Sequence, residues 1–94
     1  FVRAIIKCLE EPSAIGESFN IGNARDIITI LGLANTVCRV LNSNSKIIHR
    51  DPLSADIAIR VPKLEKAKRL LDYDAKIDLE EGIKRTAEWI KNKL

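Results

Sequence analysis

The chain has 94 residues, enough for at most one small domain with a small core. Hydrophobic residues make up 46% of it but aromatic residues only 4%, so aliphatic side chains must fill the interior. The net charge is +3, and the basic surplus after residue 45 alternates with acidic residues as on a solvated helix face, which argues against a nucleic-acid-binding patch.

The chain opens with a pattern that predicts a helix and then a strand. Residues 1–11 place apolar side chains on one helical face, and Pro12 ends the pattern. Residues 17–21 alternate polar and apolar side chains between Gly16 and Gly22, which predicts a short strand. Because the first helix begins without a cap, we expect a chain that was cut from a longer protein.

The middle of the chain repeats this order of helix and strand. Residues 27–42 form a wide apolar helical face, and the Thr29 hydroxyl is suited to cap its N-terminus. Gly32 stands where a capping box would place Glu, so the start of this helix should be loose. Residues 46–49, after a polar turn, predict a second strand.

The last third predicts an extended arm followed by two helices. Residues 56–61 read as extended, since Pro62 disfavours helix in the residue before it. Residues 63–71 predict a short helix. The final helix opens at Asp78, with Glu81 at the spacing of a capping box.

This order predicts an α/β fold. Two strands joined through a helix should be parallel with a right-handed crossover, giving a small two-stranded parallel sheet with about four helices. We expect residues 1–94 to form one lobe. Because a two-stranded sheet is a poor free-standing domain, we expect a missing partner half, and self-association through apolar surface left exposed without it.

No pattern in the sequence supplies a catalytic residue or a metal site. His49 ends a strand with no nucleophile pattern nearby, so it is interpreted as a surface or packing residue. Cys8 and Cys38 lie in apolar helical patterns and indicate core thiols in a reducing compartment, with a disulfide as the alternative. No apolar run is long enough to span a membrane and no signal peptide opens the chain, which favours a cytoplasmic protein.

Arg60 is the one candidate for ligand binding that its surroundings single out. It lies between Ile59 and Val61 on the predicted extended arm, so its side chain should have a fixed direction. An arginine so placed suits bidentate contact with a phosphate or a carboxylate. The alternative is a surface arginine paired with Asp56 or another acidic residue.

Four blocks give the chain a resemblance to a known family. They are VRAIIKCLE, GESFNIGN, ITILGLANTVCRVLN and DIAIRVPKLEKAKRLLDYDAKIDLEEGIKRTAEWI. Together they resemble the C-terminal, substrate-binding lobe of the NAD-dependent sugar-nucleotide epimerases/dehydratases, in the extended short-chain dehydrogenase/reductase family. The last block is the most specific, through Arg60, Lys66, Ala67, Lys68, Tyr73 and Trp89.

The resemblance implies that Arg60 lies near the diphosphate of a nucleotide-diphosphate sugar. The family's second arginine and preceding glycine are replaced here by Leu53 and Ala55, with Arg50 as a substitute cation, and Lys63 stands where Asp or Asn is usual. The family's glycine-rich NAD-binding loop and Tyr-x-x-x-Lys pair have no counterpart in the chain. We therefore expect NAD and catalysis to belong to a missing N-terminal NAD-binding domain.

Two hypotheses follow from the sequence. The first is the nucleotide-sugar-binding lobe of an NAD-dependent epimerase, dehydratase or decarboxylase, inactive alone. The second is a free-standing basic helical module, with residues 63–93 binding nucleic acid or a protein partner and with salt-sensitive binding as its signature.

Overall fold

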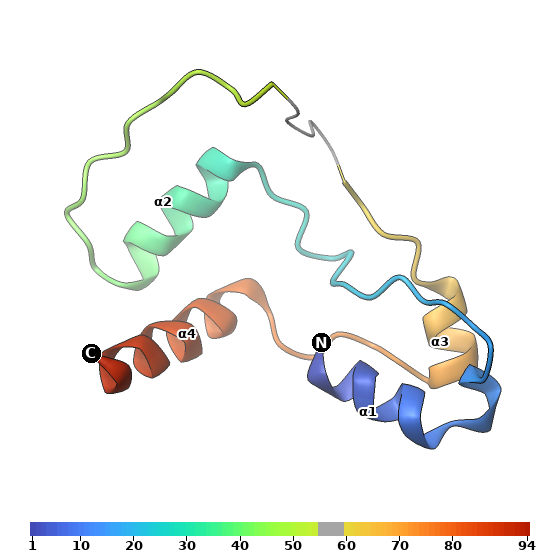
Figure 1. Cartoon of the computed structure of the whole chain (residues 1–94). Helices are drawn as coiled ribbons and strands as arrows, with labels where there is room; N and C mark the ends of the chain where they lie inside the picture. The colour runs from blue at the N-terminus through green and yellow to red at the C-terminus, as the bar shows by residue number, and fades with distance from the viewer. Residues whose placement is uncertain (55–59) are drawn as a thin grey trace. The chain divides into compact units, whose positions relative to one another are not determined.

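A computed structural model describes residues 1–54 and 60–94. In chain order these residues form four α-helices and one 3-10 helix (Figure 1): α1 (Val2–Glu10), η1 (Pro12–Ala14), α2 (Ile30–Val40), α3 (Glu65–Leu71) and α4 (Leu79–Lys93). Most of the predicted arm over residues 56–61, together with Asp56 as a partner for Arg60, lies outside the described residues.

The helices belong to two compact units, each built from two separate stretches of chain. Unit 1 comprises Phe1–Ile27 and Ile59–Lys76 and contains α1, η1 and α3. Unit 2 comprises Ile28–Ala58 and Ile77–Leu94 and contains α2 and α4. The prediction that residues 1–94 act as one lobe stays a prediction.

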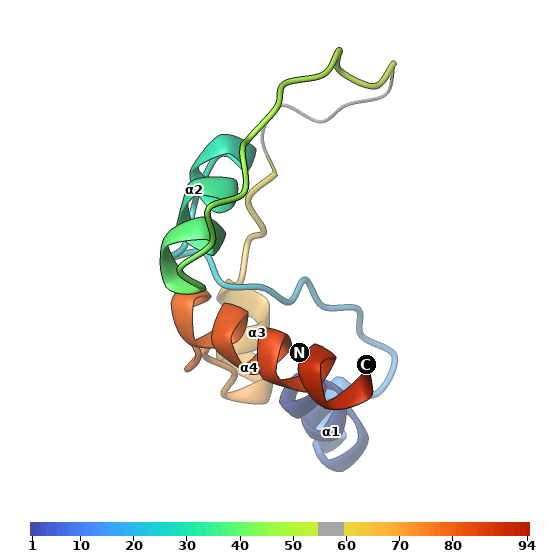
Figure 2. The same cartoon turned by 90° about the vertical axis from the view of Figure 1, so that its left-hand side faces the viewer.

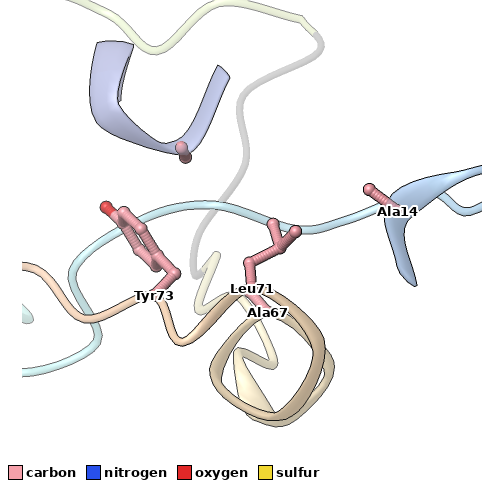
Figure 3. Packing of buried hydrophobic residues seen from close by; sticks show 5 residues of the cluster. Ala14, Ala67, Leu71 and Tyr73 are labelled. Carbon is pink, nitrogen blue, oxygen red and sulfur yellow. The ribbon is translucent and has the colours of Figure 1, made fainter. Parts of the chain in front are cut away.

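Unit 1 holds the hydrophobic core. Leu71 and Ala67 on α3 are each 1% exposed, and Tyr73, just after the helix, is 6% exposed. Figure 3 shows the side chains of Leu71 and Tyr73 gathered at the end of α3, with Ala14 of η1 beside them. The core is therefore small, consisting of Ala4, Ala14, Ala67, Leu71 and Tyr73, with Phe19 and Ile21 packed against it.

A reversal at the end of α3 brings Tyr73 into this core. Asp72 has a φ of 47°, in the left-handed region that few side chains adopt. The carbonyl of Ala67 accepts from the backbone N–H groups of both Asp72 and Tyr73. The left-handed residue thus ends the helix and turns the chain, so the phenol ring packs beside Leu71.

Unit 2 is a pair of helices without a buried residue. α2 and α4 contact each other, and Figure 2 shows them as neighbours. A salt bridge joins them, because Arg39 Nη2 lies 2.6 Å from Glu80 Oε1. Neither helix buries a residue fully, although several of their apolar side chains are half-buried.

Side-chain caps fix the starts of both helices in unit 2. Thr29 Oγ1 accepts from the N–H of Gly32 at 3.0 Å, which confirms the predicted cap of α2. Asp78 Oδ1 accepts from the N–H of Glu81 at 2.8 Å and caps α4. The Glu81 carboxylate accepts from Arg85 Nε at 2.6 Å instead of completing the capping box.

The predicted α/β fold is wrong. No strand occurs among residues 1–54 and 60–94, so the two-stranded parallel sheet over residues 17–21 and 46–49 is absent there. Alternating polar and apolar side chains are compatible with an extended backbone. A strand, however, also needs a neighbouring strand whose C=O and N–H groups pair with its own. The two segments belong to different units, and neither forms a ladder.

Much apolar surface is exposed in the described part of the chain. On α1, the predicted inward face is open, with Leu9 83% exposed and Val2 68% exposed. Cys8 is also exposed, so its prediction as a core residue is wrong, whereas Cys38 is half-buried. Both cysteines are free thiols. None of the described helices is both long enough and apolar enough to cross a membrane.

Candidate functional site

A pocket of about 610 Å³ in unit 1 contains the candidate Arg60. Two short stretches line it, residues 19–23 and residues 60–63. They are far apart in the sequence, and the fold brings them to one place. The first stretch comes from the GESFNIGN block and the second directly precedes α3, so two of the blocks behind the family resemblance meet in this pocket.

Lys66 on α3 fixes the first stretch in place. Its ammonium forms a salt bridge with Glu17 and lies 5.3 Å from the centre of the Phe19 ring. The Phe19 side chain thus packs against the core and also has the cation over its ring. The hydrogen bond and charge of Lys66 lower the pKa of Glu17 below its usual value, so this carboxylate stays ionised beside the pocket.

Gly22 and Pro62 fix the approach of the two stretches. A Cβ atom added at Gly22 would lie 2.9 Å from Pro62 Cγ, closer than real Cβ contacts allow. The proline ring cannot swing away as a long side chain would. The absence of a side chain at Gly22 is thus what permits the backbone to pack against the proline and close this side of the pocket.

The pocket has a positive charge. Arg60 and Lys63 are the two charged residues among those lining it, and no acidic residue lies among residues 19–23 and 60–63. Neither cation forms an ion pair with any residue that the structure describes. Two cations without an ion-pair partner among residues 1–54 and 60–94, beside exposed amide and backbone groups, are suited to an anionic ligand.

The two predicted substrate-binding arginines are placed differently. Arg60 is exposed and lines the pocket, in unit 1. Arg50 is exposed in unit 2 and does not line this pocket. A role for either residue in substrate binding stays a prediction, and the structure gives geometric support for Arg60 only.

Lys63 was not predicted as a pocket residue. Its position suggested the start of a helix, where a lysine replaces an N-cap residue. α3 instead begins at Glu65, with Leu64 at the cap position and no side-chain cap. Lys63 therefore lies before the helix and lines the pocket three residues after Arg60. The sequence shows this spacing, but only the fold shows that both residues line one pocket.

A second, smaller pocket of about 280 Å³ lies elsewhere in unit 1. One of its carboxylates, Asp74, is paired with Arg25, whose Nη1 lies 3.4 Å from Asp74 Oδ2. Charges of both signs thus face this pocket, which makes it a poorer anion site than the first. Its lining residues are Arg3, Lys7, Asp72, Tyr73, Asp74 and Lys76.

The described residues do not assemble a metal site. Within residues 1–54 and 60–94 no group of three or more His, Cys, Asp or Glu side chains is placed to hold a metal ion. His49 is exposed, in agreement with its interpretation as a surface residue.

Comparison with known proteins identifies the family, although no family model matches the chain. A UDP-glucuronate 4-epimerase of Thermodesulfobacterium geofontis (strain OPF15) is 30% identical over 78 residues, which are 83% of this chain and 24% of that protein. UDP-glucuronic acid decarboxylase 1 of Arabidopsis thaliana is 33% identical over 76 residues, 81% of this chain and 17% of that protein. The chain belongs to the NAD-dependent sugar-nucleotide epimerase/dehydratase family.

A third member of the sugar-nucleotide epimerase/dehydratase family agrees with the first two. UDP-glucuronic acid decarboxylase 4 of Arabidopsis thaliana is 37% identical over 65 residues, 69% of this chain and 14% of that protein. The chain thus spans a quarter or less of the length of the curated relatives it matches. The predicted resemblance to the sugar-nucleotide epimerases/dehydratases is confirmed.

Proposed function

We propose that the chain is the substrate-binding part of a sugar-nucleotide epimerase, dehydratase or decarboxylase, and that its ligand is a UDP-sugar. The observation that carries the proposal is the pocket itself. Among the described residues, positions 19–23 and 60–63 line it, the charged ones are both cations, and these form no ion pair with a described residue. The matched relatives are named for UDP-glucuronate or UDP-glucuronic acid.

In this proposal Arg60 binds the diphosphate. A guanidinium presents parallel N–H donors that match paired phosphate oxygens. The negative charge of the diphosphate also complements the positive charge of Arg60. The amide of Asn20 and the backbone of residues 19–22, which form no strand ladder, offer further hydrogen bonds to the ligand. Arg50 is proposed only as a secondary contact, since it does not line this pocket.

NAD is assigned to the rest of the enzyme. Hydride transfer needs a bound nicotinamide, and dinucleotide sites of this kind need a glycine-rich turn between a strand and a helix. The four glycines of the chain are scattered and do not form that turn. We therefore propose that this chain holds the sugar nucleotide while an NAD-binding domain outside these residues supplies the chemistry.

The exposed apolar surface is proposed to face that domain. α2 and α4 bury no residue, and Ile30 on α2 and Trp89 on α4 are 82% and 62% exposed. Large apolar side chains left exposed on neighbouring helices are suited to an interaction site. The large share of the relatives' length that lies outside this chain supports a docking domain as the partner, with self-association as the outcome when the domain is absent.

Titration of the 94-residue chain with UDP at low ionic strength tests the role of Arg60. Amide signals of residues 19–23 should shift, and Arg60→Ala should weaken binding about tenfold, because a hydrogen bond to a charged group contributes at least about 1.5 kcal/mol. Lys68→Ala is the matched control, since it removes an exposed cation of α3 that does not line the pocket. Unchanged affinity in Arg60→Ala would refute the proposal.

The same preparation distinguishes the alternative function. A basic module that binds nucleic acid would bind an unrelated DNA or RNA duplex with an affinity that falls steeply with salt. It would also lose that affinity in Lys68→Ala as much as in Arg60→Ala, because phosphate-backbone contacts add up along a basic surface. We expect no such binding.

A further inference from the structure

Lys63 is a second cation in the same pocket, and the structure gives it no partner. It lines the pocket together with Arg60 and forms no ion pair with a described residue. Lys66, three residues later, has a structural role by contrast, because its ammonium is paired with Glu17 and lies over the Phe19 ring. The contrast indicates that the charge of Lys63 is available to a ligand.

The two cations of the pocket differ in the anionic group that each can bind. Two residues lie between Arg60 and Lys63, and one of them is Pro62, whose ring fixes its backbone φ. Pro62 is also held against Gly22, so the segment that carries both cations has a defined course. A guanidinium fork alone can satisfy paired phosphate oxygens, whereas a lysine acts as a point charge toward one further group.

We infer that Lys63 is a specificity-determining residue that binds a carboxylate on the sugar, so that the pocket prefers a nucleoside diphosphate uronate to the corresponding neutral sugar. The inference rests on the proposed function, because it assigns the diphosphate to Arg60. It goes further because it names the group of the ligand that Lys63 binds. Because residues 19–23 and 60–63 include no acidic side chain, none of the described lining residues repels that carboxylate.

The experiment measures Kd for UDP, UDP-glucose and UDP-glucuronate in the 94-residue chain and its variants. The unsubstituted chain should prefer UDP-glucuronate to UDP-glucose by up to about fivefold, since an exposed ion pair contributes up to about 1 kcal/mol and 1.4 kcal/mol is tenfold. Lys63→Ala should abolish this preference, and it should weaken UDP binding by less than it weakens UDP-glucuronate binding, because only UDP-glucuronate has the carboxylate. Lys63→Arg should keep the preference, and Lys63→Glu should reverse it.

Controls separate failure of the inference from failure of the proposed function. Lys68→Ala should leave all three Kd values unchanged, and amide spectra check that each variant keeps the fold of unit 1. A loss of UDP affinity in Lys63→Ala equal to the loss for UDP-glucuronate would place Lys63 on the diphosphate and overturn the inference alone. UDP binding that is absent, or that does not depend on Arg60, would overturn the proposed function and the inference with it.

Discussion

Replacing Leu71 by Ala tests whether the small core holds unit 1 together. Leu71 is 1% exposed and is the largest side chain that unit 1 buries fully. The substitution removes three carbons, and at about 0.8 kcal/mol for each buried methylene the loss is about 2.4 kcal/mol. Measured Leu→Ala costs span about 2–5 kcal/mol and depend on how far the site can collapse. A core this close to the surface can relax, so we expect a cost of about 2–3 kcal/mol.

The assay is urea unfolding followed through the amide signals of α1 and α3. Leu9→Ala is the matched control, because it makes the same change at a leucine of unit 1 that is 83% exposed. We expect it to change the free energy of unfolding by less than about 0.5 kcal/mol. Small domains have total stabilities of about 5–15 kcal/mol. The loss in Leu71→Ala should therefore lower the urea concentration at the unfolding midpoint measurably.

Similar losses in the two variants would refute the reasoning. If Leu9→Ala cost as much as Leu71→Ala, the exposed face of α1 would have to be covered in solution, by another copy of the chain for example. If both cost less than about 0.5 kcal/mol, the cluster around Leu71 would not be the core of unit 1. Measuring the urea midpoint at several protein concentrations separates the two results, because the midpoint depends on protein concentration only if copies of the chain associate.

Two further predictions concern the stretches that form the pocket. Gly22→Ala should destabilise unit 1 by about 1–3 kcal/mol and weaken UDP binding, because its Cβ would overlap the ring of Pro62; urea unfolding and UDP titration measure both effects. The pairing with Lys66 lowers the pKa of Glu17, so its contribution to stability is present above pH of about 4.5 and is lost as the pH falls through the lowered value. Glu17→Gln should remove this part of the pH dependence of unfolding.

Each of these two predictions has a control and a contrary outcome. Gly82→Ala on α4 introduces a Cβ with nothing within 4 Å, so it should stabilise its helix by up to about 1 kcal/mol. A Gly22→Ala chain as stable as the unsubstituted chain would show that Pro62 can move. For the acid effect, a pH profile of Glu17→Gln that coincides with that of the unsubstituted chain would contradict the role of the Lys66 pair.

The helices were predictable because their signals are local. Thr29 and Asp78 cap the following turns with their own side chains, and both caps occur as predicted. The two strands were not predictable in the same way, since alternation at residues 17–21 describes a backbone conformation and says nothing about a partner. Whether an extended segment becomes a strand depends on a neighbour, and none is supplied within the described residues.

The candidate site was predictable in part for a similar reason. Arg60 stood out because Pro62 and its apolar neighbours restrict it, and it does line a pocket. Lys63 was interpreted through the helix it precedes, and its place in the pocket depends on the contact between Gly22 and Pro62. That contact joins positions forty residues apart, and only folding could reveal it.

The interleaved connectivity of the two units has a consequence for synthesis on the ribosome. Unit 1 needs residues 1–27 together with residues 59–76, so α1 emerges long before its packing partner α3. Chains elongate at about 5–20 residues per second, whereas helices form within about a microsecond. The side of α1 that carries the buried Ala4 therefore waits for seconds without α3, and the apolar face with Leu9 stays exposed throughout, which makes the nascent chain a candidate client for chaperones that shield hydrophobic segments.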